Sequence, residues 1–321
     1  MTHLSRGDAG SGGSRSPLIE PGAVDVAAYL TEKGALVDAF LDERLPAADS
    51  GPGKLHEAIR YCVFARGKRF RPALAIATCE AFHGRTEAVL PAAAAIELIH
   101  VSSLVHDDLP CMDDADLRRG KPSCHRAYGE ALAVLVGDWL LAFPFEILSC
   151  PSMGALLRPE QCCITGQEIA RSVCSSGIVA GQVADLEAER RQIGLDELQR
   201  LHVHKTGALI RAAVRCGLVA AGVPFADLDA HARFAEQLGL AFQVADDILD
   251  VTADEATLGK PVGADNANNK STYVSLLGLD GARRVAEETA AQAHALLTEL
   301  PPGSDPSVLH ALVDFVVGRG S

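Results

Sequence analysis

The chain has 321 residues, 48% of them hydrophobic, and its 29 Lys plus Arg against 42 Asp plus Glu give a formal net charge of −13. This acidity argues against a nucleic-acid-binding protein and against a polybasic membrane-surface protein, because both need a basic surface. The apolar content excludes a disordered chain. An acidic protein can still bind a small anion if its few cations lie together.

The ends and cysteines of the chain indicate its compartment. Residues 1–22 are rich in Gly and Ser and lack an apolar signal-peptide core, so we expect a flexible N-terminal tail. The nine cysteines contain no CxxC pair and are odd in number, which favours free thiols over a disulfide framework. The longest apolar stretch, 131–147, is interrupted by Asp138 and Pro144 and is too short for a membrane span. We therefore expect a cytoplasmic protein.

Almost every remaining segment has a helical pattern, because Ala, Leu and Glu dominate and period-2 alternation is nearly absent. Pro72 and Pro91 are placed at helix starts. We expect one all-α domain over residues 23–321, a single large helical bundle around a central apolar cavity. Its helices are expected at 23–45, 52–65, 72–82, 91–109, 129–149, 159–175, 195–221, 226–251, 280–299 and 306–318.

A first group of carboxylates follows the expected helix at 91–109. His100 and Asp107 share one face of that helix, and Asp108 comes directly after them. Pro110 should end the helix, so that Asp113 is presented from a turn. Clustered carboxylates repel one another unless a cation neutralises them, and a set of oxygen ligands alone favours Mg²⁺ over Zn²⁺. The alternative is a solvated acidic loop.

A second group of polar residues ends the expected helix at 226–251. Gln243, Asp246, Asp247 and Asp250 lie at i, i+3, i+4 and i+7, which places them on one helical face. Mg²⁺ commonly uses one or two carboxylates together with phosphate oxygens of a substrate. Two Asp-rich helix ends facing each other across a cavity would therefore hold a diphosphate between metal ions.

The cations of the chain lie where such a substrate needs them. Arg binds phosphate oxygens in a bidentate manner, and Lys supplies a point charge. Each cation taken alone is more simply explained as a solvated surface charge, but several adjoin the Asp clusters. The candidates are Lys68, Arg69, Arg71, Arg118, Arg119, Lys121, Lys205, Lys260 and Lys270.

These residues together resemble the trans-isoprenyl diphosphate synthases of the bacterial short-chain type. The similarity covers about residues 60–275, keeps the family order, and rests on five motifs. The run at 111–122 is more similar to geranylgeranyl diphosphate synthases of bacterial carotenoid pathways than to farnesyl diphosphate synthases. The motifs are GKRFRP at 67–72, DDLPCMDDADLRRG at 107–120, GQVAD at 181–185, HKTG at 204–207, and QVADDILD at 243–250 with Gly259 and Lys260 behind it.

The resemblance implies an isoprenoid-synthase fold, a homodimer and a role for each matched residue. Isopentenyl diphosphate would be held by Lys68, Arg71, His100 and Arg119. The allylic diphosphate would be held by Arg118, Lys205, Lys260 and Lys270. Mg²⁺, as three ions with substrate bound, would be held by Asp107, Asp113 and Asp246, with Asp108, Asp247 and Asp250 in support. Thr206 and Gln243, beside Lys205, would present oxygen dipoles to a developing carbocation.

The residues before Asp107 bear on product length. Ser103 and Ser102 lie four and five positions before Asp107, about one helical turn down the expected channel wall. Similar farnesyl diphosphate synthases carry a bulky aromatic at the fifth position, so the small Ser102 predicts a deeper channel and a C20 product. A C15 product stays open, since neighbouring helices could close the channel.

Three other readings remain alternatives. A non-catalytic subunit of a prenyl synthase would be expected to lose one Asp motif or its arginines, and both are present. A terpene cyclase would not need a second diphosphate pocket. A structural bundle with acidic ends would not need ordered motifs. Ala115 and Val274 depart from the family pattern, where Asp and Pro are frequent, and neither is a proposed metal ligand.

Overall fold

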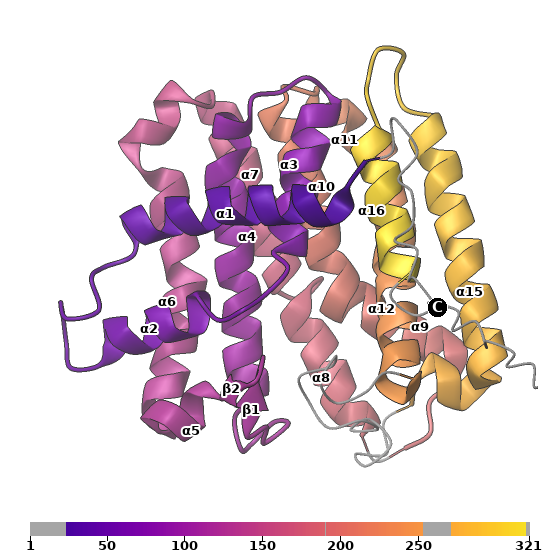
Figure 1. Cartoon of the computed structure of the whole chain (residues 1–321). Coiled ribbons are helices and arrows are strands. Elements are labelled where there is room, and N and C mark those ends of the chain that lie inside the picture. Colours follow the sequence, from indigo (N-terminus) through magenta and orange to yellow (C-terminus); the bar gives the residue numbers. More distant parts are fainter. Residues whose placement is uncertain (1–23, 190, 253–270, 319–321) are drawn as a thin grey trace, which may run out of the picture.

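The computed structural model describes residues 24–189, 191–252 and 271–318, and these residues are almost entirely helical (Figure 1). Within these ranges the strands are β1 (Leu117–Arg118) and β2 (Lys121–Pro122), which pair antiparallel with Arg118 opposite Lys121. The all-α prediction is confirmed. The expected tail at 1–22 and the candidates Lys260 and Lys270 lie outside the described residues.

The helices follow the expected order, with two helices in addition, α5 and α8, and with two expected segments divided. The helix α8 was not expected, because Gly177 and Gly181 interrupt its apolar pattern. The segment expected at 195–221 is divided by a π-helical turn at Val203–Gly207, and the one expected at 226–251 is divided at Arg233. The helices are α1 (Val26–Arg44), α2 (Leu55–Val63), α3 (Phe70–Ala81), α4 (Thr86–Asp107), α5 (Cys124–Tyr128), α6 (Glu130–Ser149), α7 (Pro159–Val173), α8 (Ile178–Ala188), α9 (Leu195–His202), α10 (Ala208–Ala220), α11 (Leu228–Ala232), α12 (Phe234–Thr252), α15 (Tyr273–Thr298) and α16 (Ser307–Gly318).

Local side-chain chemistry sets several helix starts. Asp25 accepts a hydrogen bond from the Ala28 amide at 3.0 Å, and Thr272 and Ser275 cap the start of α15 reciprocally. The prediction that a helix starts at Pro91 was wrong, because α4 begins at Thr86 and contains Pro91. Pro91 loses its own N–H hydrogen bond and its ring crowds the carbonyl oxygen of Glu87, and tertiary packing around α4 outweighs this cost.

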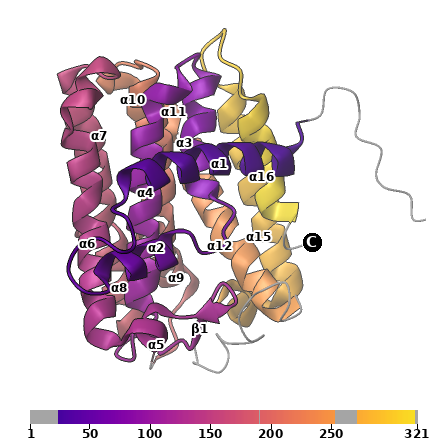
Figure 2. The same ribbon diagram turned by 60° about the vertical axis from the view of Figure 1, so that its left-hand side comes forward.

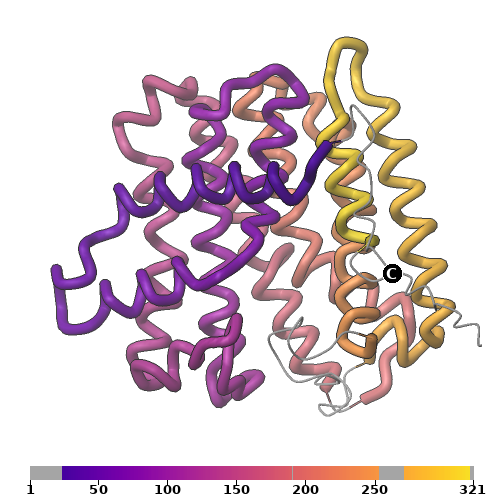
Figure 3. The backbone as a smooth tube through the Cα atoms, in the orientation of Figure 1, coloured from indigo at the N-terminus to yellow at the C-terminus, as the bar shows by residue number. Residues whose placement is uncertain are grey.

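Helix α4 lies at the centre of the bundle, with α1, α3, α6 and α10 packed around it (Figures 1 and 2). Helix α1 crosses α3 and α4 at a steep angle, as the backbone trace shows (Figure 3). The alanines at 92–95 on α4 are each at most 1% exposed. Their small side chains let the neighbouring helices approach, so one central helix can serve several partners.

Two described helices, α4 and α6, are long and apolar enough to cross a membrane by length and composition alone. The apolar window of α4 is 78% buried inside the bundle, which explains its composition as that of a core helix. The window of α6 is only 44% buried. Helix α6 therefore carries an apolar outer face, on which Val134, Leu135 and Phe145 are exposed.

Glycine spacing between α10 and α3 generates a stability prediction. A Cβ at Gly217 would lie 2.5 Å from the Ala75 carbonyl oxygen and 2.8 Å from Thr78 Cβ, whereas one at Gly166 on α7 would meet nothing within 4 Å. Gly217→Ala should lower the free energy of unfolding by about 1–3 kcal/mol, because the helices must separate. Gly166→Ala should raise it by about 0.5–1 kcal/mol through helix propensity. Urea denaturation measures both, and equal stabilities would contradict the packing argument.

Candidate active site

The first Asp cluster is built by the end of α4 and the turn behind it. The helix ends at Asp107, as Pro110 led us to expect. The Asp113 amide then donates to the Asp107 carbonyl oxygen at 2.9 Å, and the Asp114 amide donates to the Leu109 carbonyl oxygen at 3.1 Å. This hydrogen-bonded turn folds back on the helix end, so Asp107 and Asp113 are presented from one compact segment.

A cavity of about 640 Å³ opens beside this segment. One part of its wall is apolar and includes Leu104, Leu209, Phe242 and Leu249. The expected central cavity is therefore present, but it is apolar on only part of its wall. Its charged and imidazole-bearing wall consists of Lys68, Arg71, His100, Asp107, Arg118, Arg119, Lys205 and Asp246.

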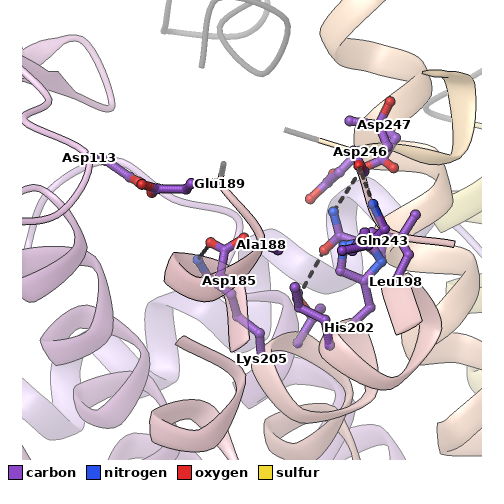
Figure 4. A pocket seen from close by; sticks show the side chains of 15 residues that line it. Asp113, Asp185, Ala188, Glu189, Leu198, His202, Lys205, Gln243, Asp246 and Asp247 are labelled. Atoms are coloured by element: carbon purple, nitrogen blue, oxygen red, sulfur yellow. Dashed lines mark hydrogen bonds and ion pairs between the residues drawn. The ribbon is translucent and has the colours of Figure 1, made fainter. Parts of the chain in front are cut away.

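A second cavity of about 220 Å³ is lined partly by the same residues. Lys205, Thr206 and Asp246 belong to the walls of both cavities, so the two adjoin. In Figure 4 the side chain of Asp113 points toward that of Glu189 on one side of the small cavity. Its further polar lining residues include Asp185, His202, Gln243 and Asp247. Asp107 at the end of α4 and Asp246 on α12 thus line one cavity, as the spacing of the carboxylates predicted.

Lys205 connects three of the sequence motifs. Its Nζ donates to Asp185 Oδ2 on α8 at 2.6 Å and lies 3.9 Å from Asp107 Oδ2. It stands in the π-helical turn, a feature common at functional sites. A Cβ at Gly181 would lie 2.3 Å from the Lys205 amide nitrogen, so only glycine allows α8 to pack on this turn. The structure shows that Asp185 binds Lys205, a role that the GQVAD motif alone did not assign to it.

Thr206, Gln243 and Asp247 form a hydrogen-bonded row. Thr206 Oγ1 donates to Gln243 Oε1 at 3.0 Å, and Gln243 Nε2 donates to Asp247 Oδ1 at 2.9 Å. Asp247 Oδ2 also accepts from the Tyr273 amide at 2.8 Å, which anchors the start of α15. The row fixes the amide orientation of Gln243. It also means that the Gln243 oxygen is engaged by Thr206 and that Asp247 has a structural role.

Arg119 reaches the large cavity from the β1–β2 turn. It has φ +54°, and Gly120 behind it has φ +76°, so two consecutive residues in the left-handed region close the hairpin. A Cβ at Gly67 would lie 2.6 Å from Arg119 Nη1, which shows that the guanidinium packs directly on the Gly67 backbone. Arg119 Nη2 lies 3.5 Å from His100 Nε2. The sequence contains no Asn-Gly pair, so this hairpin was not predicted.

His100 is held neutral by its surroundings. Burial lowers its pKa well below the usual value for histidine, and the positive charges of Arg71 and Arg119 lower it further. A neutral imidazole beside two guanidinium groups can still donate or accept a hydrogen bond. His100 therefore offers the cavity a hydrogen-bonding group without an additional charge.

Two predicted metal ligands are placed away from both cavities. Asp108 is 2% exposed, and Arg118 Nε donates to its two carboxylate oxygens at 3.0 and 3.2 Å. Asp250 is 3% exposed and belongs to neither cavity wall. From its spacing, Asp250 was expected on the same helical face as Asp246. That face is wide, so the Asp246 carboxylate reaches the cavity while the Asp250 carboxylate is buried in the core.

The two serines before Asp107 face different neighbours. Ser103 lines the large cavity, whereas Ser102 is 1% exposed and donates to the Gly137 carbonyl oxygen of α6 at 2.9 Å. The expectation that both serines form one wall is therefore not met. Successive residues of a helix are rotated by about 100°, so both cannot face the same space.

The carboxylates that do reach the cavities fit a hard divalent cation. Of the predicted metal ligands, Asp107, Asp113, Asp246 and Asp247 line the cavities, and all four offer oxygen ligands. Among the described residues, no three acidic, His or Cys side chains already surround one point as a complete metal cage. Mg²⁺ is commonly bound by one or two carboxylates, with water and substrate phosphate oxygens at its other positions.

Sequence reasoning missed two residues of the small cavity, Glu189 and His202. Glu189 directly follows α8, a helix that the pattern did not predict. His202 stands one helical turn before Lys205, at i and i+3, and its ring lies against Tyr273 with centroids 5.7 Å apart. The helical spacing to Lys205 could have identified His202.

His202 generates a prediction about pH. Burial lowers its pKa to about 4, with Asp185 opposing the shift and Lys205 adding to it. In the unfolded chain histidine titrates near 6.5, so between about pH 6.5 and 4 the unfolded state takes up a proton that the folded state does not. Stability should fall as pH falls through this window, by up to about 3 kcal/mol from this residue. Melting temperatures at several pH values test this; a His202→Gln profile as steep as the parent's would contradict it.

Comparison with known proteins places this geometry in a family. The polyprenyl synthetase family model matches residues 52–300. Geranylgeranyl pyrophosphate synthase 9, chloroplastic, of Arabidopsis thaliana is 44% identical over 300 residues, which cover 92% of this chain and 82% of that protein. Geranylgeranyl pyrophosphate synthase, chloroplastic, of Catharanthus roseus is 42% identical over 296 residues, covering 92% and 82%.

Solved structures agree. The apo structure of an FPP/GFPP synthase from Zymomonas mobilis has a TM-score of 0.79 at 36% identity, covering 91% of this chain and 99% of that one. Geranyltransferase from Helicobacter pylori, complexed with magnesium and isoprenyl diphosphate, has a TM-score of 0.80 at 33% identity, covering 93% and 100%. The resemblance noted in the motifs is thereby confirmed, and the chain belongs to the polyprenyl synthetase family of trans-isoprenyl diphosphate synthases.

Proposed function

We propose that this enzyme condenses isopentenyl diphosphate with the allylic diphosphates dimethylallyl, geranyl and farnesyl diphosphate to give geranylgeranyl diphosphate. The observation that carries the proposal is one cavity of about 640 Å³ with clustered cations and carboxylates on one part of its wall and apolar side chains on the other. The names of the plant relatives support a C20 product. Use of that product in carotenoid biosynthesis is proposed from the motif at 111–122 alone.

The two diphosphates would occupy different parts of the charged wall. Isopentenyl diphosphate would lie against Lys68, Arg71, His100 and Arg119, which lie at the start of α3, on α4 and in the hairpin. The allylic diphosphate would lie against Arg118 and Lys205, next to the Asp clusters, with Lys260 and Lys270 assigned to it by the family motif alone. Guanidinium groups suit this task because they bind phosphate oxygens in pairs.

Asp107, Asp113 and Asp246 would hold Mg²⁺, with Asp247 nearby, and three ions are proposed with substrate bound. The H. pylori relative, described in complex with magnesium, supports the choice of metal. Bound Mg²⁺ supplies positive charge that offsets the charge on a leaving diphosphate. The chain's own contribution is to hold Lys205 in place, since Asp185 and Asp107 fix its ammonium group beside the same site.

The bond changes in the proposed reaction balance without a protein nucleophile. The allylic C–O bond breaks and its electron pair leaves with the diphosphate, which Arg118 and Lys205 would bind. The double bond of isopentenyl diphosphate forms the new C–C bond to the allylic cation, and the released diphosphate takes up the proton that is lost. Leu104, Leu209, Phe242 and Leu249 would keep water from the cation.

Thr206 would act on this cation through its oxygen. Thr206 lines both cavities, and because its hydroxyl donates to Gln243, its oxygen lone pairs would be left to face positive charge. Gln243 would then act as the residue that orients Thr206, with its own amide held by Asp247. This arrangement refines the expectation that both oxygens point directly at the cation.

We also propose a homodimer formed through the outer face of α6. Val134 and Leu135 on this helix are 41% and 56% exposed, although its composition is that of a core helix. A second copy of the chain would cover these side chains.

All nine cysteines, which lie in the described part, are free thiols, and this supports a reducing compartment such as the cytoplasm. The relatives from A. thaliana and C. roseus are named as chloroplastic.

Removal of the proposed metal ligands tests the function. Asp107→Ala and Asp246→Ala should each lower kcat by at least about 100-fold, because charge on the leaving group is no longer offset. Asp280→Ala, a change at a side chain that is 89% exposed on α15, is the control and should keep parental turnover. Purified proteins are incubated with Mg²⁺, isopentenyl diphosphate and each primer. Full turnover by both site variants would refute the assignment, and absence of turnover by the parent would favour a non-catalytic subunit.

Product length is tested at the two serines. Ser103→Phe should place a ring in the large cavity and shift the main product from C20 to C15. Ser102→Phe should instead press on Gly137 of α6, so that it lowers the melting temperature and shortens the product less. Chromatography of dephosphorylated products measures the outcome. A parent that stops at C15 would establish the farnesyl alternative, and an unchanged C20 product from Ser103→Phe would contradict the cavity assignment.

A further inference from the structure

Arg69 lies between Lys68 and Arg71, which are assigned to isopentenyl diphosphate, but its own side chain points into the protein. Its Nε donates to Asp38 Oδ1 at 2.8 Å, its Nη1 to Glu97 Oε1 at 2.8 Å, and its Nη2 to the Val63 carbonyl oxygen at 2.7 Å. The residue is 5% exposed and is not part of the large cavity's wall. All three guanidinium nitrogens are therefore used inside the protein, and Arg69 cannot bind substrate in this arrangement.

The backbone at Arg69 is also constrained. It has φ +46° and ψ +37°, in the left-handed region, directly before the first residue of α3. A non-glycine residue there costs about 1 kcal/mol, which the three side-chain hydrogen bonds offset. A Cβ at Gly34 on α1 would lie 3.3 Å from Arg69 Cγ, so the side chain fits closely against α1. The backbone and side chain of Arg69 are thus both fixed, directly beside Lys68 and two residues before Arg71.

Glu97 links this anchor to the other half of the cation cluster. It lies on α4, one turn before His100, and is 1% exposed. Its Oε1, which accepts from Arg69, is also 4.0 Å from Arg119 Nη2. Arg119 in turn contacts His100 and packs on the Gly67 backbone. One buried carboxylate therefore lies behind the cavity wall, between two guanidinium groups.

The charges explain why such a carboxylate is needed. Burial lowers the pKa of Arg119, Glu97 opposes that effect, and the positive charges of Arg69 and Arg118 add to it. Without a buried negative charge, the cations on this wall would repel one another and move apart. With it, they can be held close together before any diphosphate arrives.

We propose that Arg69, Glu97 and Asp38 are positioning residues for isopentenyl diphosphate, which hold the 67–71 segment and Arg119 in their binding arrangement without touching the substrate. The inference rests on the proposed function, since it concerns the same site. It predicts a selective effect: affinity for isopentenyl diphosphate depends on the Arg69–Glu97 pair, and affinity for the allylic diphosphate does not.

The chain contains a matched control for this test. Glu168 on α7 is also a buried helical glutamate, and it binds both Nε and Nη2 of the buried Arg215 at 2.6 and 3.0 Å. Neither residue belongs to the wall of the two active-site cavities. Glu97→Gln and Glu168→Gln thus remove the same charge from the same kind of ion pair, at the site and away from it.

The experiment measures both KM values, kcat and melting temperature for the full chain and its variants, with Mg²⁺. Glu97→Gln should raise KM for isopentenyl diphosphate at least tenfold and leave KM for the allylic diphosphate within twofold. Glu97→Asp, which keeps the charge, should recover most of the loss. Glu168→Gln should lower the melting temperature without changing either KM. Asp38→Asn, at a side chain 41% exposed, is a milder variant that keeps the test open if Glu97→Gln does not fold, and should raise the same KM about threefold.

Two results would overturn the proposal. One is a Glu97→Gln variant that loses melting temperature as Glu168→Gln does and keeps both KM values, and the other is an equal change in both KM values. Calorimetric titration of isopentenyl diphosphate alone separates this inference from the proposed function. Binding by the parent that Glu97→Gln weakens supports positioning even without turnover, whereas absence of parental turnover counts against the proposed function only.

Discussion

The site depends on one constraint: a charge placed among apolar helices must have a partner of opposite charge at a fixed distance. Removing one member of a buried ion pair lowers the free energy of unfolding by about 3–5 kcal/mol, because the remaining charge is left without a partner. Arg69 and Glu97 form such a buried pair, and the partly exposed Arg118 and Lys205 are bound by Asp108 and Asp185. Each pair orients a cation or its neighbour toward the cavities, and so the apolar bundle can carry a highly charged site without losing its packing.

A second constraint acts through the backbone. Gly67 lies under the Arg119 guanidinium, Gly181 lies on the Lys205 backbone, and a Cβ at Gly239 of α12 would lie 3.0 Å from Gly207 Cα. At Gly181 the contact is with backbone atoms, so a side chain would separate α8 from the π-helical turn, and at Gly67 a side chain would displace the Arg119 guanidinium. The glycines of the GKR and GQ motifs therefore let segments distant in sequence approach closely enough for their polar side chains to share one cavity.

The sequence predicted on which face of its helix each polar residue lies. It did not predict which other helix or turn packs against that face. The spacing of Asp246 and Gln243 correctly placed them together, because helix geometry is local. Ser102 was expected in the channel, but only the position of α6 decides that it faces Gly137. The Arg119–Gly120 turn has two positive φ values that no Asn-Gly pair announced, since its conformation is maintained by contacts to Gly67 and His100. Helix α8 was missed for a similar reason, as its glycines serve contacts with another segment.

The π-helical turn at Val203–Gly207 has a consequence for how this site can change over time. Such a turn contains one more residue than a turn of α-helix, so it is equivalent to a helix into which a single residue has been inserted. Deleting one residue there would restore regular helix between α9 and α10 while preserving the apolar periodicity of both. Because the turn absorbs the extra residue, α9 and α10 would keep the faces that they present to the bundle, whereas Lys205 and Thr206 inside the turn would point elsewhere. A chain that lost this residue could thus keep its fold and lose its chemistry in one step, an outcome that no single substitution at Lys205 reproduces.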